Sequence, residues 1–104
     1  MLQAIKKLLG LGPKPDLTEV MSRGAVIVDV RTPGEYAGGH IKGSINIPLN
    51  ILQSQLSRLK KDKPIITCCA SGMRSASARS MLVARGFSEV HNGGSWLKLK
   101  NLEK

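Results

Sequence analysis

The segment Cys68–Ser75, which reads CCASGMRS, holds the residues best suited to chemistry in this chain. It follows an apolar run and precedes a helical pattern, so it should form a strand-to-helix turn. The unpaired N–H groups of a helix's first turn favour an anion, and therefore a thiolate. We interpret the segment as a cysteine nucleophile in an anion-binding loop. The residues assigned to that loop are Ala70, Ser71, Gly72, Met73 and Arg74.

Length and charge limit the classes of protein that the chain can belong to. Its 104 residues suit a single domain, and 16 basic against 7 acidic side chains give a net charge of +9. The basic residues are scattered, and no aromatic residues alternate with them as they do on a base-stacking surface. We therefore expect no nucleic-acid partner, but a field that steers small anions toward a cleft.

The cysteines and histidines do not form a metal-binding pattern. Two adjacent cysteines cannot build a disulfide framework, and they indicate free thiols in a reducing compartment. With two distant histidines they lack the ligand spacing of a zinc site. We therefore expect no metal and no organic cofactor. We also expect a cytoplasmic protein, because no stretch resembles a signal-peptide core or reaches membrane-spanning length.

The chain divides into a basic amphipathic lead-in, residues 1–15, and a domain, residues 16–104. A break rich in glycine and proline, residues 10–15, separates them. Within residues 2–9 the apolar side chains share one helical face. A helix packed on the domain is the favoured interpretation, and an interfacial membrane anchor is the alternative.

Strand and helix patterns alternate along the domain. We expect strands at 25–30, 44–48, 64–68 and 87–91. Helices are expected at 17–23, 51–60, 74–85 and 95–102, with a helical turn that begins at Thr32 and a tight turn at 92–94. This order predicts an α/β fold, a three-layer sandwich whose small, mainly parallel sheet is flanked by helices. A site in such a sheet lies at the carboxyl ends of the strands.

Three ordered segments resemble the rhodanese-like family of sulfurtransferases. Residues 29–48, DVRTPGEYAGGHIKGSINIP, match its amino-terminal signature, D-V-R-x-x-x-E-[FY]-x-x-G-H-I-x-G-[AS]-x-N-I-P. Residues 69–75 match its active loop, C-x-x-G-x-R-S, and residues 82–96 resemble its closing pattern of Gly-aromatic, strand and Gly-Gly-x-Trp. The resemblance implies transfer of sulfane sulfur from thiosulfate or a similar anionic donor to cyanide, a thiol or an acceptor protein. A cysteine persulfide would be the intermediate.

Either of the two cysteines can be counted as the first residue of the loop motif. Counted from Cys69, the loop has six residues and ends at Arg74, as in members that handle sulfur. Counted from Cys68, it reads C-x-x-x-x-x-R-[ST], the signature of cysteine phosphatases with a related fold. We favour Cys69 as the nucleophile, and regard Cys68 as a buried apolar residue or a resolving thiol. A persulfide relay module that serves a protein partner remains an alternative to an enzyme.

Other conspicuous residues are given mainly structural roles. Arg31, Cys68 and Trp96 are candidates for the pocket, although a structural ion pair between Asp29 and Arg31 and packing of Trp96 are the favoured interpretations. Glu35 should belong to the helix cap at Thr32. The histidines, His40 and His91, should be structural rather than catalytic.

Overall fold

The computed structural model describes residues 16–102 and contains a four-stranded parallel sheet of order β2-β1-β3-β4. The strands are β1 (Val26–Asp29), β2 (Ile45–Asn46), β3 (Ile65–Cys69) and β4 (Val90–Ser95). The helices are α2 (Leu17–Ser22), α3 (Pro33–Ala37), α4 (Met73–Ala84) and α5 (Trp96–Leu102), with a 3₁₀ segment η1 (Leu49–Arg58). The predicted α/β class is confirmed.

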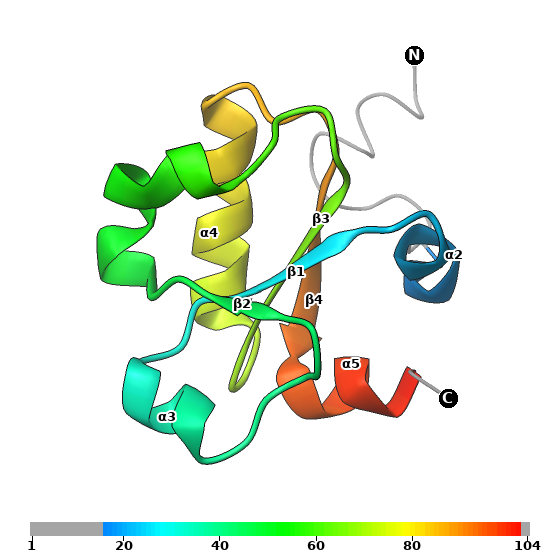
Figure 1. Ribbon diagram of the computed structural model, residues 1–104, viewed down its shortest axis with the longest axis vertical. Helices are drawn as coiled ribbons and strands as arrows, with labels where there is room; N and C mark the ends of the chain where they lie inside the picture. The colour runs from blue at the N-terminus through cyan, green and yellow to red at the C-terminus, as the bar shows by residue number, and fades with distance from the viewer. Residues whose placement is uncertain (1–15, 103–104) are drawn as a thin grey trace.

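Two apolar clusters cover the two faces of the sheet, as the unbroken apolar strands predict. Figure 1 shows α4 and η1 on one side of the strands, and α2 and α5 on the other. The first cluster includes Val28, Leu82 and Cys69, and the second includes Ile27, Leu99 and Cys68. Since successive strand side chains point to opposite faces, the two cysteines lie in different layers.

Local capping residues fix the starting points of α2 and α3. Asp16 caps α2 and accepts the N–H of Thr18 at 3.0 Å. At α3, Thr32 and Glu35 form a complete capping box, and Pro33 occupies the first turn. Figure 1 shows that α3 lies near the end of the sheet where β3 turns into α4. This is the carboxyl end of the strands, where the site was expected.

The final strand differs from the expectation. The predicted strand at 87–91 is wrong, because β4 spans Val90–Ser95 and includes the glycines assigned to a turn. A Cβ at Gly93 would lie 2.7 Å from Ile66 Cγ2 and 2.9 Å from the Thr67 carbonyl oxygen. The glycine therefore allows β4 to approach β3 closely. The register shifts between Thr67 and Cys69, which accommodates an extra residue in β4.

The segment predicted as a helix at 51–60 is the 3₁₀ segment η1, and it begins two residues earlier. Gln55 interrupts it with φ −115° and ψ 16°. Leu52 and Leu59 still pack in the cluster below α4, so the apolar spacing predicted the buried face but not the helix type.

The sequence raised two questions about membranes: whether any helix crosses one, and whether residues 2–9 bind to one. Within residues 16–102, no helix combines the length and the apolar character needed to cross a bilayer. The amphipathic lead-in, residues 1–15, lies outside the described residues, and so does the interfacial anchor considered for residues 2–9.

Candidate active site

Cys69 is the last residue of β3, and the following loop encloses its sulfur. The side chain is 0% exposed. The Gly72 N–H donates to Sγ at 3.0 Å and the Ser75 N–H donates at 3.4 Å, while Ser75 Oγ lies 3.5 Å away. Gly72 has φ +108°, a left-handed conformation that turns its N–H inward, and α4 starts at the next residue. The backbone therefore forms an anion-binding nest around one sulfur atom.

The surroundings of the two thiols shift their pKa values in opposite directions. Burial raises the pKa of Cys69, but hydrogen bonds from the Ser75 side chain and from main-chain N–H groups outweigh it and lower the pKa below its ordinary value. Burial raises the pKa of Cys68 to about 12, and the nearby Asp29 carboxylate adds to the rise. The surroundings therefore favour the thiolate form at Cys69 and disfavour it at Cys68.

Asn92, on β4, supports the loop through hydrogen bonds of its side-chain amide. Its Oδ1 accepts the Ser75 hydroxyl at 2.6 Å and the Gly94 N–H at 2.9 Å, and its Nδ2 donates to the Gly72 carbonyl at 3.3 Å. Gly72 and Ser75, whose N–H groups donate to Sγ, are therefore both held by the side-chain amide of Asn92. Ser75 and Asn92 were not among the predicted site residues. The serine stood in the loop motif. The signal for the asparagine was its place in the 92–94 segment after a predicted strand, at the end of the sheet where a site is expected.

Ser75→Ala should raise the pKa of Cys69. It removes the Oγ contact to Sγ but keeps the Ser75 N–H. The measurement is the rate of iodoacetamide alkylation against pH, whose midpoint should move upward. Ser71→Ala is the matched control, since Ser71 is exposed and acts on Sγ through its main-chain N–H. Equal midpoints for both variants would contradict a role for the Ser75 hydroxyl.

The Arg74 guanidinium makes no hydrogen bond to the Cys69 sulfur. It forms a two-pronged ion pair with Glu35 at 2.8 and 3.0 Å. That pair holds the pKa of Glu35 at about 2, and it joins α3 to the first turn of α4. Arg74 also lines a small, mainly apolar cavity of about 350 Å³ together with Val30 and Leu49. Backbone N–H groups, rather than this side chain, make the direct contacts to Sγ.

Arg74→Ala should weaken use of thiosulfate, because the Glu35 carboxylate would then face the incoming anion without its partner. We expect kcat/KM for thiosulfate to fall by up to about fivefold, the scale of a half-exposed ion pair. Glu35→Gln should not lower it, since that variant keeps the guanidinium charge. Steady-state kinetics of both variants and of their double variant test this. Unchanged kinetics in Arg74→Ala would remove the charge from the site.

Arg31 forms a buried ion pair with Asp29 and packs against Trp96. Arg31 is 3% exposed and Asp29 is 1% exposed, and the guanidinium donates to the carboxylate at 2.7 Å. The guanidinium carbon lies 4.5 Å from the centre of the Trp96 ring, and the same Nη2 that donates to Asp29 also donates to the Gly39 carbonyl at 2.7 Å. The structure thus contains the predicted ion pair and places Trp96 against it. Cys68 packs in the same layer, with a 0% exposed side chain.

The histidines have local partners. His40 stacks on Tyr36 with ring centroids 3.8 Å apart, and its Nδ1 lies 2.7 Å from the Tyr36 carbonyl. His91 Nε2 lies 2.8 Å from a Glu89 oxygen. Over residues 16–102 there is no group of three or more His, Cys, Asp or Glu side chains that could hold a metal ion. Neither histidine contacts Cys69.

Together, the fold and the site define a parallel α/β protein with a buried cysteine sulfur held by main-chain N–H donors. The chain belongs to the family of the rhodanese-like domain, whose model matches residues 14–100. The resemblance seen in the sequence is therefore confirmed.

Individual relatives and solved structures agree with the family. Over 74 residues the chain is 40% identical to the thiosulfate sulfurtransferase GlpE of Ectopseudomonas mendocina, a match that spans 71% of this chain and 68% of that protein. It is 40% identical to YqhL of Bacillus subtilis over 67% of this chain, but it spans only 56% of that relative's length. The human single-domain sulfurtransferase TSTD1 superposes with a TM-score of 0.73 at 25% identity, over 85% of this chain and 92% of that one. Relatives named sulfurtransferases therefore support the predicted enzyme class.

Proposed function

We propose that the chain is a thiosulfate-type sulfurtransferase that carries sulfane sulfur on Cys69. The observation that carries the proposal is the setting of Cys69. Its sulfur accepts hydrogen bonds from main-chain N–H groups, and the pKa of its thiol is lowered. A thiolate at neutral pH needs no general base, which fits a site without a nearby histidine. Relatives named thiosulfate sulfurtransferases support the choice of donor.

In the first step, the Cys69 thiolate attacks the outer sulfur of thiosulfate. A new S–S bond forms, the S–S bond of thiosulfate breaks, and sulfite leaves with the electron pair. The products are the Cys69 persulfide anion and sulfite, so charge and atoms balance. The N–H groups of the loop stabilise the anionic sulfur before and after transfer. Because Cys69 is 0% exposed, the structure around its sulfur has to open before a donor can reach it.

In the second step, cyanide or a thiolate attacks the terminal sulfur and returns Cys69 as a thiolate. The Met73 side chain is 79% exposed beside this loop, which leaves room for a large acceptor. Both cysteines are free thiols, as a reducing cytoplasm would keep them. We propose no metal and no organic cofactor for either step.

The phosphatase alternative requires Cys68 as the nucleophile. Its side chain is 0% exposed in the layer opposite Cys69, and its pKa is raised to about 12. These observations favour sulfur transfer over phosphate hydrolysis. They also argue against Cys68 as a resolving thiol, since adjacent strand residues point away from each other.

Mass spectrometry of the full chain after exposure to thiosulfate tests the proposal. We expect a gain of one sulfur atom that maps to Cys69, is lost in Cys69→Ser, and is discharged by cyanide as thiocyanate. Sulfur gain with transfer only to protein thiols would identify a relay. Hydrolysis of an aryl phosphate without sulfur gain would contradict the proposal and favour the phosphatase.

A further inference from the structure

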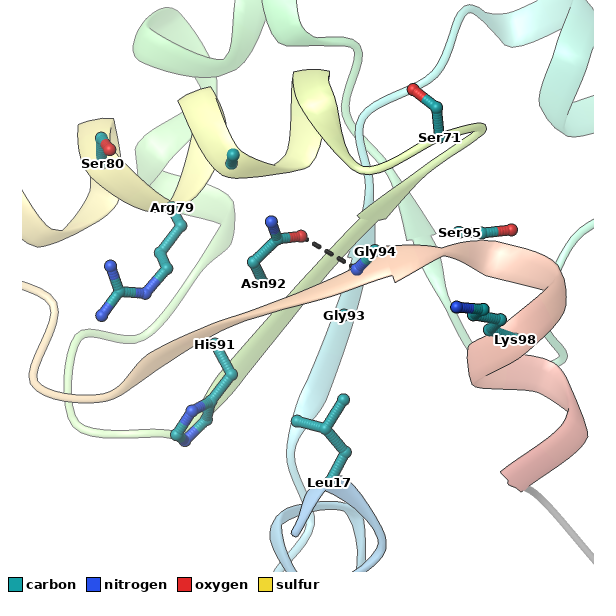
Figure 2. A pocket seen from close by; sticks show the side chains of 11 residues that line it. Leu17, Ser71, Arg79, Ser80, His91, Asn92, Gly93, Gly94, Ser95 and Lys98 are labelled. Carbon is teal, nitrogen blue, oxygen red and sulfur yellow. Dashed lines mark hydrogen bonds between the residues drawn. The ribbon is translucent and has the colours of Figure 1, made fainter. Parts of the chain in front are cut away.

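A cavity of about 760 Å³ runs along β4, outside the sulfur-binding loop. Figure 2 shows its lining side chains, which come from α4 on one side and from α2 and α5 on the other. β4 is the last strand in the sheet order, so the cavity follows a sheet edge. The residues that matter here are Ser71, Arg79, Ser80, Asn92, Gly94 and Lys98. Ser71 belongs to the sulfur-binding loop and Asn92 supports that loop, whereas the proposed chemistry assigns no role to Arg79, Ser80 or Lys98.

The cavity is basic. Arg79 and Lys98 line it, and none of its described lining residues is acidic. Glu89 lies near His91, but Arg23 already pairs with that carboxylate at 2.6 Å. The two cations therefore face the cavity without a carboxylate among its lining residues, and they favour an anionic occupant.

The two cations stand near opposite ends of the strand. Arg79 Nε donates to the Val90 carbonyl at 2.9 Å, where β4 begins, and Lys98 belongs to α5, which starts after β4 ends. Figure 2 shows Arg79 near His91 and Lys98 near Ser95. From Val90 to Ser95 a strand extends by roughly 17 Å. A single small anion is too short to reach both, whereas an extended segment with several negative charges fits.

One end of the cavity meets the sulfur-binding loop. Ser71 lines it, and Gly94 lies so close to the loop that a Cβ on Gly72 would be 3.4 Å from its Cα. Asn92 Nδ2 donates to the Gly72 carbonyl across this junction. A chain that lies along β4 thus arrives at the loop that encloses Cys69.

We propose that this cavity, the β4 groove, binds an acidic, extended segment of a protein sulfur acceptor that carries the receiving cysteine. The proposal rests on the sulfurtransferase function proposed above. The acceptor thiolate attacks the terminal sulfur of the Cys69 persulfide, a new S–S bond forms on the acceptor, and the Cys69 thiolate leaves. No oxidant or reductant is consumed. The chain's own residues 1–15 are a poor match in charge, since they contain three lysines and no acidic residue.

The test uses the full chain, loaded with sulfur from thiosulfate, and a short synthetic peptide with one cysteine flanked by aspartates. Matched peptides replace the aspartates with asparagine or lysine. Lys98→Glu should lower kcat/KM for the acidic peptide by about tenfold, an effect that weakens as salt is added. Ser80→Glu, on the α4 wall, should act in the same direction. Turnover of cyanide should not change in either variant.

Two matched controls separate the groove from general charge effects. Lys42→Glu reverses an exposed charge beside β2, at the opposite edge of the sheet, and Ser77→Glu adds a charge to α4 on a residue outside the groove. Both should change the acidic-peptide rate by less than about twofold.

Equal effects of Lys98→Glu and Lys42→Glu, or no preference for the acidic peptide, would overturn the proposal. Failure to form any persulfide would instead overturn the proposed function. In that case the groove is tested separately by the fluorescence anisotropy of the labelled acidic peptide, whose binding should still weaken in Lys98→Glu.

Discussion

Cys69→Ser should lower cyanide-dependent cleavage of thiosulfate by about a thousandfold or more, as loss of a nucleophile does in other covalent enzymes. A serine hydroxyl stays protonated near neutral pH, so the N–H groups of Gly72 and Ser75 would have no thiolate to stabilise. The measurement is thiocyanate production, together with circular dichroism to confirm folding. The substitution is nearly isosteric, so stability should change little.

Cys68→Ser is the matched control for this prediction. The same atom is replaced one residue earlier, in the opposite layer of the fold. It places a hydroxyl among apolar side chains and should cost stability, but the folded variant should keep most of its activity. If Cys68→Ser lost activity while Cys69→Ser retained it, the nucleophile would be Cys68.

Asp29→Ala should lower the free energy of unfolding by about 3–5 kcal/mol, because it leaves the buried Arg31 charge without its partner. The Arg31 side chain donates to both carboxylate oxygens of Asp29, and its guanidinium lies over the Trp96 ring. Urea unfolding followed by Trp96 fluorescence measures the change. Asp62→Ala, at an exposed turn residue, is the control and should shift stability by less than about 0.5 kcal/mol.

A second variant distinguishes an unpaired charge from lost packing. Asp29→Ala combined with Arg31→Met removes both charges, and it should recover part of the stability lost in the single variant. If the double variant were as unstable as the single one, the loss would come from packing and from the carbonyl contacts of Arg31. Those contacts join the segment after β1 to α3 and to the loop that follows α3, and Glu35 of α3 pairs with Arg74.

The β4 groove and the sulfur-binding loop share a structural element. Asn92 contacts the loop through Gly72 and Ser75 while it lines the groove. A bound acceptor would therefore lie against the amide that positions the donors to Cys69. This arrangement places acceptor binding and sulfur activation on adjacent sides of one loop.

The amino-acid sequence by itself determined the architecture and the reactive segment. Unbroken apolar runs such as 64–68 predicted buried parallel strands, and the capping residues Asp16 and Thr32 predicted two helix starts. These signals are local, because strand burial and helix capping depend on residue types within a few positions. The position of the loop between an apolar run and a helical pattern also placed it at a strand end.

Tertiary structure decided what each side chain contacts. The pairing of Arg74 with Glu35 joins residues 39 positions apart, and Asn92 reaches Ser75 only because β4 packs beside β3. The same packing drew Gly93 into a strand that sequence patterns assigned to a turn. Such contacts depend on the close approach of distant segments, and residue type alone carries no information about that distance. The sequence could therefore indicate the candidate nucleophile, but only the folded chain shows which hydrogen-bond donors contact its sulfur.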